Sequence, residues 1–452
     1  MFADKKILVI GAGVSGFSAA AALAKCGAQY VCLNDIKPVK LAAEVKERLQ
    51  KQGIDMIFGQ QDKSLLDQID YVIVSPGIPR SIPILTEASQ RNIPIISEIE
   101  VASRLCKCPI LAVTGTNGKT TTVSLLAELM KQTGRPVIIG GNIGMGLAEQ
   151  VTEGPDNAIV VAELSSYQLE STETLCPQIS AVLNVTPDHL ERHKTMEAYW
   201  SAKEKIFLNQ GQRQTTVLNF DNEITRKMAE DAASHVLFFS MHTVLEDGAY
   251  YKDGKLYLAK NGECREICSR DTIHLLGDHN IENCLAAVLM ADAFGVSLES
   301  IKKVLSVFSG VEHRIEPVRT IHGVPYYNDS KATNVDSSIK ALESFDGHII
   351  LIAGGYDKMN DLQEFMALAA KKTDALLLIG NAAERFYAAA QQAGIKDIRR
   401  LSSMEEAVRT AYEIAAPPQT VLLSPACSSY DMFRCFEERG TVFKTLVNAL
   451  EE

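Results

Sequence analysis

The chain has 452 residues, of which 46% are hydrophobic and 22% are charged. These proportions are typical of globular proteins, and the length predicts about three domains. The formal net charge of −11 argues against a general nucleic-acid or anionic-membrane surface. No apolar run approaches the ~20 residues of a membrane span, and the first residues lack a signal-peptide pattern. We therefore expect a cytoplasmic protein with no nucleic-acid partner and no membrane insertion.

The ten cysteines are scattered through apolar segments of the sequence. The nearest pairs, Cys106/Cys108 and Cys264/Cys268, have no second pair and no partner histidines at zinc-site spacing. Because no export signal is found, we expect buried, reduced thiols rather than disulfides or a zinc site.

The N-terminal segment begins with a short apolar strand, Lys6–Ile10, followed by the loop Gly11-Ala-Gly-Val-Ser-Gly16. A helix is expected over Phe17–Lys25 and a second strand over Tyr30–Leu33, with Asp35 after it. This is the outline of a dinucleotide-binding fingerprint. The backbone N–H groups of such a loop bind the pyrophosphate of any nucleotide, so the loop alone does not specify NAD.

Further short strands over 70–74 and 93–96 complete a small α/β domain within residues 1–97. This domain is too short for a full dehydrogenase core, and we expect it to bind a nucleotide-diphosphate substrate. The candidate contacts are residues that follow its strands: Gly11, Val14, Ser15, Gly16, Asp35 and Ser75.

The central segment contains a buried strand, Ile110–Val113, the loop Thr114-Gly-Thr-Asn-Gly-Lys-Thr120, and a helix that includes Ser124–Lys131. The glycines let successive N–H groups face an anion, and the helix N-terminus adds a partial positive charge. Lys119 is placed to reach terminal phosphates, and the Thr120 hydroxyl to bind Mg²⁺. The sequence therefore predicts a nucleoside triphosphate site.

Three further polar residues of this segment are candidates for the same site. Glu163 ends the strand 158–163, where a carboxylate near a phosphate loop is suited to Mg²⁺; a helix-capping or solvated Glu is the alternative. His189 follows the strand 179–184 and is either a second metal ligand or a surface histidine. Lys203 lies in a helical run, and its spacing indicates only a helix-surface lysine.

The segment 211–270 is expected to form strands and turns, with a hairpin over Tyr250–Tyr257. A helix then runs through Ala293. Asn280 and Asn283 share one face of this helix and are either helix caps or amides that bind an adenine edge.

The C-terminal segment repeats one pattern, in which a buried strand is followed by a polar or glycine-rich loop. The strands are expected over 324–328, 348–353, 374–379 and 420–423. Helical stretches over 361–372 and 382–394 predict a parallel sheet with crossovers and functional residues on one sheet edge. The predicted fold class is α/β with three domains: Rossmann-like over 1–97, P-loop ATPase-like over 98–311, and Rossmann-like over 312–452.

A set of short motifs, taken in order, resembles the Mur ligase family. The motifs are Gly-x-Gly-x-Ser-Gly at 11–16, Ser-Pro-Gly-Ile at 75–78, Thr-Gly-Thr-Asn-Gly-Lys-Thr at 114–120, Gly-Gly-Asn-Ile-Gly at 140–144, Glu-Leu-Ser-Ser-Tyr-Gln-Leu at 163–169, Asn-Asp-Ser-Lys-Ala-Thr-Asn at 328–334 and Ser-Pro-Ala-Cys-Ser-Ser-Tyr-Asp at 424–431. Each alone is a weak signal, but their order is specific. Within the family, the sequence is most similar to the members that add D-glutamate.

The resemblance implies an ATP-dependent amide ligase of peptidoglycan precursor synthesis. Such enzymes phosphorylate the L-alanyl carboxylate of UDP-N-acetylmuramoyl-L-alanine, and the amine of D-glutamate then attacks the acyl phosphate. The implied cofactors are ATP and Mg²⁺, the partners are these small-molecule substrates, and a monomer is expected.

The resemblance also implies roles for individual residues. Catalytic roles fall on Lys119, Glu163, His189 and Lys203, and metal contacts on Thr120, Glu163, His189 and Lys203, with Lys203 carried as a carbamate, N6-carboxylysine. ATP contacts fall on Gly115, Thr116, Asn117, Gly118, Lys119, Thr120, Thr121, Asn280, Asn283, Arg314 and Asp329. UDP-substrate contacts fall on Val14, Ser15, Asp35, Ser75, Asn142 and His189. D-glutamate contacts fall on Lys331, Thr333, Lys358, Ser429, Tyr430 and Phe436.

The sequence departs from its relatives at two places. Met359 stands where many relatives have glycine, and Ile36 and Lys37 stand where some have a threonine and an arginine. Uracil contacts at 36 and 37 are therefore left open.

Other functions are weighed against this interpretation. A ligase for diaminopimelate or lysine should carry an Asp-Asn-Pro-Arg-like motif, which we do not find, and a folylpolyglutamate synthase should lack the N-terminal Gly-x-Gly domain. An NAD(P)-dependent oxidoreductase would leave Lys119 and Thr120 unexplained. A non-catalytic nucleotide-binding scaffold would not consume ATP in response to an amino acid.

Overall fold

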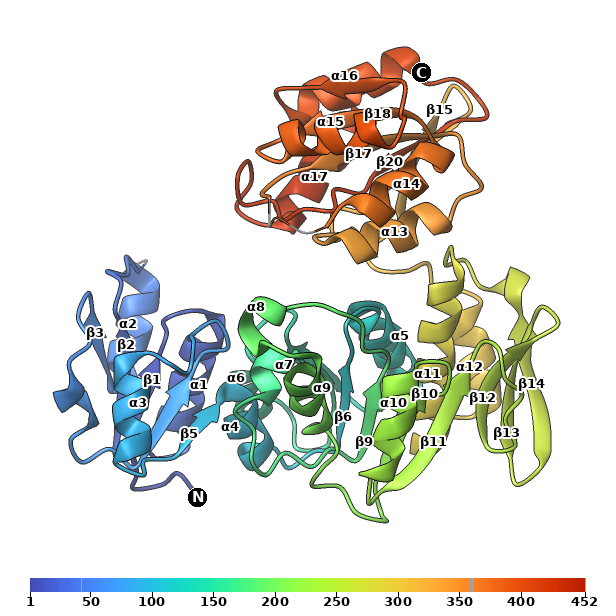
Figure 1. Ribbon diagram of the computed structural model, residues 1–452. Helices are drawn as coiled ribbons and strands as arrows, with labels where there is room; N and C mark the ends of the chain where they lie inside the picture. The colour runs from blue at the N-terminus through green and yellow to red at the C-terminus, as the bar shows by residue number, and fades with distance from the viewer. Residues whose placement is uncertain (42, 358, 360, 452) are drawn as a thin grey trace. The chain divides into compact units, whose positions relative to one another are not determined.

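The computed structural model describes residues 1–41, 43–357, 359 and 361–451 and shows an α/β protein with three sheets (Figure 1). The chain divides into two compact units, Met1–Ile273 with Ile281–Val307, and His274–Asn280 with Phe308–Glu452. Among the described residues, no helix is both long and apolar enough to cross a membrane.

The first sheet is parallel throughout and has the strand order β3-β2-β1-β4-β5. Its strands are β1 (Lys6–Ile10), β2 (Tyr30–Asp35), β3 (Ile54–Phe58), β4 (Tyr71–Val74) and β5 (Ile95–Ser97), with helices α1 (Val14–Lys25), α2 (Ala43–Lys51) and α3 (Pro83–Gln90). The helix after the glycine loop begins at Val14 and not at Phe17. A Cβ at Gly16 would lie only 1.8 Å from the Gly11 carbonyl oxygen, so glycine there lets the first helical turn pack directly on the loop.

The second sheet has the order β14-β13-β12-β11-β10-β9-β6-β8-β7 and is parallel from β7 through β12. Its strands are β6 (Ile110–Thr114), β7 (Val137–Gly141), β8 (Ile159–Glu163), β9 (Ile179–Val182), β10 (Thr215–Asn219), β11 (His235–Ser240), β12 (Gly248–Lys252), β13 (Lys255–Lys260) and β14 (Glu263–Ser269). The expected hairpin is confirmed, because Tyr250 pairs with Tyr257 between antiparallel β12 and β13.

Nine helices, of 4 to 17 residues, precede, connect or follow the strands of the second sheet among the described residues. They are α4 (Glu98–Leu105), α5 (Lys119–Lys131), α6 (Leu147–Glu153), α7 (Ser166–Leu169), α8 (Leu190–His193), α9 (Met196–Glu204), α10 (Glu223–Lys227), α11 (Asp278–Phe294) and α12 (Leu298–Leu305). The division between the two compact units falls inside α11, after Asn280.

The third sheet has the order β15-β16-β20-β17-β18-β19, and all pairs except β15 with β16 are parallel. Its elements are β15 (Glu316–Ile321), β16 (Val324–Asn328), α13 (Val335–Glu343), β17 (Ile349–Gly354), α14 (Gln363–Lys372), β18 (Thr373–Ile379), α15 (Ala383–Gln392), β19 (Ile398–Arg400), α16 (Met404–Ile414), β20 (Thr420–Leu423) and α17 (Phe436–Asn448). The parallel sheet with helical crossovers is confirmed, and all its parallel strands end at one edge.

The cysteines depart from expectation in one respect. All ten are free thiols, but only Cys32, Cys284 and Cys427 are buried, whereas Cys176 and Cys264 are exposed. The expectation of buried thiols is therefore wrong for most of them, because cysteine is small enough to sit at the rim of an apolar segment as well as inside it.

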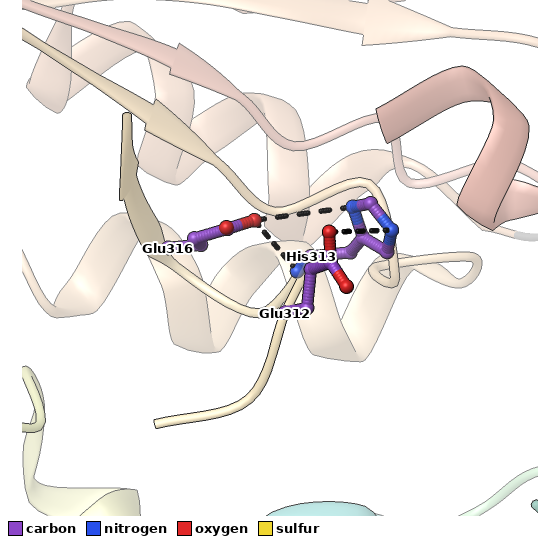
Figure 2. Close-up of side chains that lie close together, drawn as sticks. All are labelled: Glu312, His313 and Glu316. Atoms are coloured by element: carbon purple, nitrogen blue, oxygen red, sulfur yellow. Dashed lines mark hydrogen bonds and ion pairs between the residues drawn. The ribbon is translucent and has the colours of Figure 1, made fainter. Parts of the chain in front are cut away.

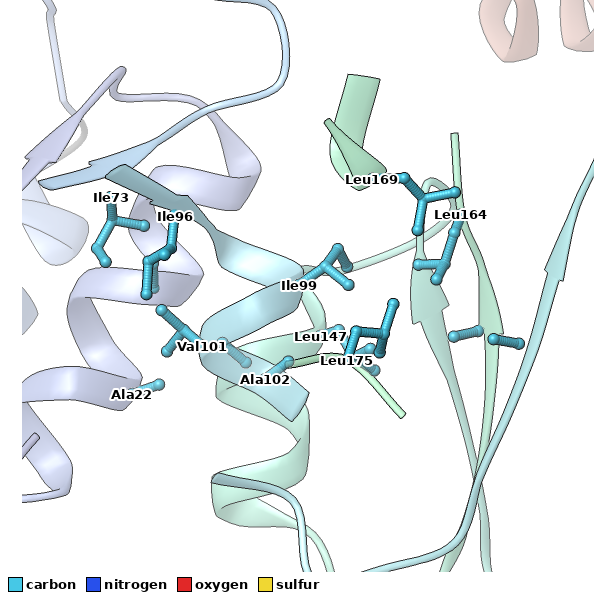
Figure 3. Close-up of a cluster of buried hydrophobic side chains, with 14 of the residues drawn as sticks. Ala22, Ile73, Ile96, Ile99, Val101, Ala102, Leu147, Leu164, Leu169 and Leu175 are labelled. Carbon is cyan, nitrogen blue, oxygen red and sulfur yellow. The ribbon is translucent and has the colours of Figure 1, made fainter. Parts of the chain in front are cut away.

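A continuous apolar core joins the first sheet to the second. Figure 3 shows Ala22 from α1, Ile96 from β5 and Ile99 from α4 in one buried cluster with Leu147 from α6. These four side chains are at most 2% exposed. Helix α4 thus packs on one side against the first domain and on the other against the second sheet.

A carboxyl group lies inside this core. Glu98, the first residue of α4, is 2% exposed, and its Oε1 accepts bonds from Ser18 Oγ at 2.9 Å and the Ala148 N–H at 2.6 Å. Its Oε2 is buried and has no hydrogen-bond partner among the described residues. Burial raises the pKa of Glu98 from 4.5 to about 7, while the bonds from Ala148 and Ser18 oppose the shift.

We expect Glu98 to make the protein less stable as the pH rises. The folded chain binds this proton more tightly than the unfolded chain, so the free energy of unfolding falls between pH 4.5 and about 7, and the loss is complete above that range. Glu98→Gln removes the titrating group. Urea unfolding from pH 5 to pH 8 should therefore show wild type losing stability relative to this variant.

The matched control for this experiment is Glu153→Gln, at the exposed end of α6. Its unfolding midpoints should run parallel to those of wild type. Parallel curves for wild type and Glu98→Gln would contradict the assignment.

Candidate active site

The loop between β6 and α5 is held in shape by the segment that follows β9. Asn184 Oδ1 accepts from the Asn117 N–H at 2.9 Å, and Asn184 Nδ2 donates to the Asn117 carbonyl at 3.2 Å. The Thr116 hydroxyl accepts from the Thr186 N–H at 3.0 Å. Gly118 has a φ of 84°, in the left-handed region that favours glycine. The loop is therefore fixed by the protein itself, ready for an anion.

Two lysine amines converge on one carbonyl oxygen of this loop. Lys119 Nζ donates to the Gly115 carbonyl at 2.8 Å and to the Thr116 carbonyl at 2.7 Å, and Lys203 Nζ donates to the same Gly115 oxygen at 2.9 Å. Lys203 is 1% exposed, so the expectation of a helix-surface lysine is wrong. Burial, and then the charge of Lys119, hold the pKa of Lys203 well below its usual 10.5, while Asp188 opposes this shift.

Glu163 lies at the end of β8, directly beside the loop. Its Oε2 accepts from Thr120 Oγ1 at 2.8 Å and its Oε1 from Asn142 Nδ2 at 2.8 Å. The residue is 2% exposed, which rules out the alternative of a solvated glutamate. Carboxylate and hydroxyl oxygens are the donors that Mg²⁺ prefers, so the donor set of Thr120 and Glu163 fits that ion.

His189 lies further from the loop than the other candidates. Its side chain is 41% exposed and pairs with Asp188 at 3.4 Å and Glu191 at 3.5 Å. The imidazole packs against the rings of Tyr167 at 4.9 Å and Tyr199 at 6.5 Å between centroids. The Tyr199 hydroxyl in turn bonds the Thr116 hydroxyl at 3.1 Å. His189 is thus linked to the loop through Tyr199, and its contact with a metal stays a prediction.

The glycine loop of the first domain is braced by two of the predicted substrate residues. Asp35 Oδ2 accepts from the Ala12 N–H at 3.0 Å and its Oδ1 from the Lys37 N–H at 2.9 Å. Ser75 Oγ donates to the Gly11 carbonyl at 3.1 Å. Both side chains therefore shape the loop, and their contacts with a substrate stay predictions.

Apolar side chains stand exposed at the same strand ends. Val14 and Ile36 are each 62% exposed, after β1 and β2, and Ser15 beside Val14 is half-buried. Such large exposed apolar groups at a strand-end loop are suited to contact a planar base, so Ile36 is compatible with the uracil contact that the sequence left open.

The two asparagines of α11, Asn280 and Asn283, have different surroundings. Asn283 Oδ1 accepts from the Thr122 hydroxyl at 3.3 Å, and a Cβ at Gly118 would lie 2.1 Å from it. Asn280 Nδ2 donates to the Leu276 carbonyl at 2.7 Å and belongs to the other compact unit. Asn283 thus packs on the phosphate loop, and the adenine contact stays a prediction for both.

In the second unit, Asp329 forms a buried centre after β16. It is fully buried, and Ser424 Oγ donates to its Oδ2 at 2.8 Å and the Ile315 N–H to its Oδ1 at 3.3 Å. Burial raises the pKa of Asp329 to about 6, while the positive charge of Arg314 opposes the shift. The structure therefore brings together two of the predicted nucleotide residues, Arg314 and Asp329.

The predicted glutamate residues follow β16 and β20, at one edge of the third sheet. Lys331 Nζ lies 4.7 Å from the centroid of the Phe436 ring, and the Thr333 N–H donates to the Lys331 carbonyl at 2.9 Å. Ser429 is buried, whereas Tyr430 is 72% exposed. Their binding roles stay predictions, and Lys358 lies outside the described residues.

Sequence reasoning missed a buried guanidinium behind these residues. Arg439 is 1% exposed and donates to Ser330 Oγ at 3.0 Å, the Ser330 carbonyl at 2.7 Å and the Cys427 carbonyl at 3.0 Å. Burial lowers the pKa of Arg439 to about 10. No local pattern marks it, because an arginine inside a helix usually faces solvent. Asn184 was also missed, although its place at a strand end was a usable signal.

A cluster of possible metal ligands lies at the start of the third domain. Figure 2 shows Glu312, His313 and Glu316, whose ligand atoms lie within 4.8 Å of one another. Lys444 Nζ, however, contacts the carboxylates of Glu312 at 2.8 Å and Glu316 at 2.7 Å, and Asn328 Nδ2 lies 2.9 Å from His313 Nδ1. Lysine supplies the cation here, so the cluster anchors α17 and is not a metal centre.

Comparison with known proteins gives relatives over the full chain. UDP-N-acetylmuramoylalanine–D-glutamate ligase of Thermoanaerobacter pseudethanolicus is 44% identical, over 99% of this chain and 98% of the relative. The protein of the same name from Clostridioides difficile is 41% identical, over 99% of each chain.

Solved structures and family models agree with these relatives. MurC of Thermotoga maritima has a TM-score of 0.59 at 21% identity, covering 93% of this chain and 95% of that one, which indicates a shared fold. MurF of Acinetobacter baumannii has a TM-score of 0.61 at 16% identity, covering 98% and 91%. Family models match residues 5–97 as a MurD-like N-terminal domain, 113–291 as a Mur ligase middle domain and 313–427 as a glutamate ligase domain. The chain belongs to the Mur ligase family.

Proposed function

We propose that this protein is an ATP-dependent ligase that joins D-glutamate to UDP-N-acetylmuramoyl-L-alanine in peptidoglycan precursor synthesis. The observation that carries the proposal is the arrangement around Gly115, where Lys119 and Lys203 meet beside the Thr120–Glu163 pair. The choice of substrates rests on the names of relatives that match over nearly the whole chain. We also propose a monomer in the cytoplasm.

The first step is phosphoryl transfer from ATP to the L-alanyl carboxylate. The backbone N–H of Gly118 and those at the N-terminus of α5 bind the phosphates, because the N–H groups of Thr116 and Asn117 already donate to Asn184. Lys119 swings from the Gly115 carbonyl to neutralise the phosphates. Thr120 and Glu163 would hold Mg²⁺, which when bound neutralises phosphate charge. The transfer breaks the bond to the terminal phosphoryl group, forms an acyl phosphate and leaves ADP.

In the second step the amine of D-glutamate attacks the acyl carbon. The C–N bond forms as the C–O bond to phosphate breaks, phosphate leaves, and the amine loses its proton. The residues proposed to orient the amino acid are Lys331, Thr333, Ser429, Tyr430 and Phe436, together with Lys358. Because phosphate is a good leaving group, the protein's main task is to position the reactants and to stabilise charge.

The environment of Lys203 supports its proposed carbamylation. CO₂ adds only to an uncharged amine, and burial with a neighbouring cation increases the uncharged fraction of Lys203. The reaction forms an N–C bond and releases one proton. The carbamate places two oxygens at the loop, where they would join the oxygen donors of Thr120 and Glu163.

The function is tested by measuring phosphate release with ATP and UDP-N-acetylmuramoyl-L-alanine, adding amino acids one at a time. We expect release that depends on D-glutamate. Release with diaminopimelate or lysine instead would identify a different ligase of the family, and tight NADH binding that the UDP substrate fails to displace would favour an oxidoreductase.

Lys119→Ala should abolish most turnover while the fold persists. Loss of the phosphate-neutralising charge is expected to lower kcat by about 10²–10³-fold. Lys131→Ala, at the exposed end of the same helix, is the matched control and should retain full activity. Near-normal phosphate release from a folded Lys119→Ala enzyme would refute the assignment of the loop.

Gly118→Ala should weaken ATP binding, because a methyl group there would meet Asn283 Oδ1 at 2.1 Å. Gly134→Ala is the control: Gly134 also has a positive φ, of 75°, but nothing within 4 Å of the added carbon. Calorimetry should show ATP affinity lost only in the first variant, whereas both incur a backbone strain of about 1 kcal/mol. Equal ATP affinities would show that the Gly118–Asn283 contact does not shape the loop.

Lys203→Ala should be nearly inactive and partly rescued by short carboxylates such as acetate. The missing group is an anion at the metal, so a small carboxylate can take its place. With ¹³CO₂, wild type should show a carbamate carbon signal by NMR that Lys203→Ala lacks, whereas Lys227→Ala, an exposed lysine, should keep both the signal and the activity. Full activity of Lys203→Ala in CO₂-free buffer would refute the carbamate.

A further inference from the structure

A compact cluster formed by Glu170, Arg192 and His193 packs around the Tyr167 ring. Arg192 donates to Glu170 through Nη2 at 2.7 Å and through Nε at 3.4 Å, and its guanidinium carbon lies 5.0 Å from the centroid of the Tyr167 ring. His193 Nδ1 lies 3.3 Å from Glu170 Oε1. The side chains of Arg192 and Glu170 are 17% and 20% exposed, so the ion pair is mostly shielded from water.

Arg192 also reaches out of the central domain. Its Nη2 donates to the carbonyl of Ile78, in the loop after β4 of the first domain, at 3.2 Å. Two residues further along that loop, Arg80 donates to Ser171 Oγ at 3.0 Å. The loop that contains Ser75 is therefore fastened to the central domain at two points, Arg192 and Ser171.

Within the same cluster, Ser166, His193 and Glu170 follow one another as in a catalytic triad, but the serine is not accessible to a substrate. His193 Nε2 lies 3.0 Å from Ser166 Oγ, and its Nδ1 faces Glu170. Ser166 is 3% exposed, and the Tyr167 ring stacks on His193 at 5.5 Å between centroids. A nucleophile needs access to its substrate, so these three residues orient the segment after Glu163 and do not react.

The contacts form one path between two substrate-facing loops. On one side, Ser75 bonds the Gly11 carbonyl, which ties the path to the glycine loop. On the other, Tyr167 lies under Arg192 and against the ring of His189 at 4.9 Å. A substrate with a nucleotide at one end and a reacting carboxylate at the other must contact both loops, so their spacing determines where the carboxylate lies.

We propose that Arg192 is a positioning residue that fixes this spacing, by joining the Ser75–Ile78 loop to the segment that carries Tyr167 and His189. The inference rests on the proposed function, because it assigns the UDP substrate to these loops. Arginine suits this role because the two N–H groups of Nη2 serve the Glu170 carboxylate and the Ile78 carbonyl, while Nε makes a second bond to Glu170. The single nitrogen of lysine lacks this second bond and does not fix the plane of the group.

The test compares binding of two ligands to the same variants. Calorimetry measures the Kd of UDP-N-acetylmuramoyl-L-alanine and of ATP for wild type, Arg192→Ala and Arg192→Lys, with kcat and each KM measured in parallel. We expect Arg192→Ala to weaken the UDP substrate by about 10- to 100-fold and to leave ATP affinity unchanged. Arg192→Lys should fall between wild type and Arg192→Ala.

The matched control is Arg91→Ala. Arg91 also pairs with two carboxylates, those of Asp67 and Glu87, but both lie within the first domain. It should alter neither Kd. If Arg192→Ala does not fold, the test is made with Arg192→Lys. A loss of affinity for the UDP substrate but not for ATP in that variant then supports the proposal.

Two outcomes would overturn the inference: unchanged affinity for the UDP substrate, or an equal loss for both ligands, which indicates a merely structural role. Failure of the proposed function is a separate result, because wild type would then release no phosphate in response to D-glutamate. Arg192 would still be judged by the two affinities.

Discussion

Two lysine amines share the carbonyl oxygen of Gly115, and this contact sets the electrostatics of the site. Lys119 approaches the oxygen to 2.8 Å and Lys203 to 2.9 Å. Two positive charges so close together repel strongly where one of them is 1% exposed, because little solvent screens them. The burial of Lys203 and this repulsion both hold the pKa of that lysine well below its usual value. The loop therefore presents Lys119 to a phosphate and keeps behind it a buried amine that loses its proton more readily than a free lysine.

The strand order explains why the partners of this contact meet. In the second sheet β9, β6, β8 and β7 are neighbours and parallel, so their carboxyl ends lie in a row. β6 ends at the phosphate loop, β8 delivers Glu163, and the residues after β9 and β7 supply Asn184 and Asn142. Ligand sites in parallel sheets form at such edges. The same rule accounts for Asp329 and Ser424 in the third sheet, after β16 and β20.

The parts of the site that follow from local pattern were predictable from sequence. The loop at 115–118 and Glu163 each lie at the end of a recognisable strand, and the structure finds them in contact with Lys119 and Thr120. The burial of Lys203 was not predictable from local pattern. Helix α9 buries Tyr199, Ala202 and Lys203, whereas lysine is almost never fully buried unless it is paired. The burial of Arg439 was missed for the same reason, because a charged side chain in a helix is expected to face solvent. Asn283 was named as a candidate, but its contact with Gly118 was not predicted. That contact depends on tertiary packing, which no spacing within α11 reveals.

Buried guanidinium groups fix the spacing between loops that follow strand ends. Such loops lack the ladder of hydrogen bonds that fixes strands, so their spacing needs other constraints. Arg439 joins the loops after β16 and β20 through neutral acceptors. Burial lowers its pKa to about 10, while the charges of Cys427, Asp431 and Asp329 oppose the shift. Arg192 has Glu170 as a counter-ion, which reduces the cost of desolvation and leaves a donor for the Ile78 carbonyl. In both cases several hydrogen bonds to different loops offset burial of the charge. The loops are thereby held at fixed distances by the protein's own side chains, which is what the positioning of reactants requires.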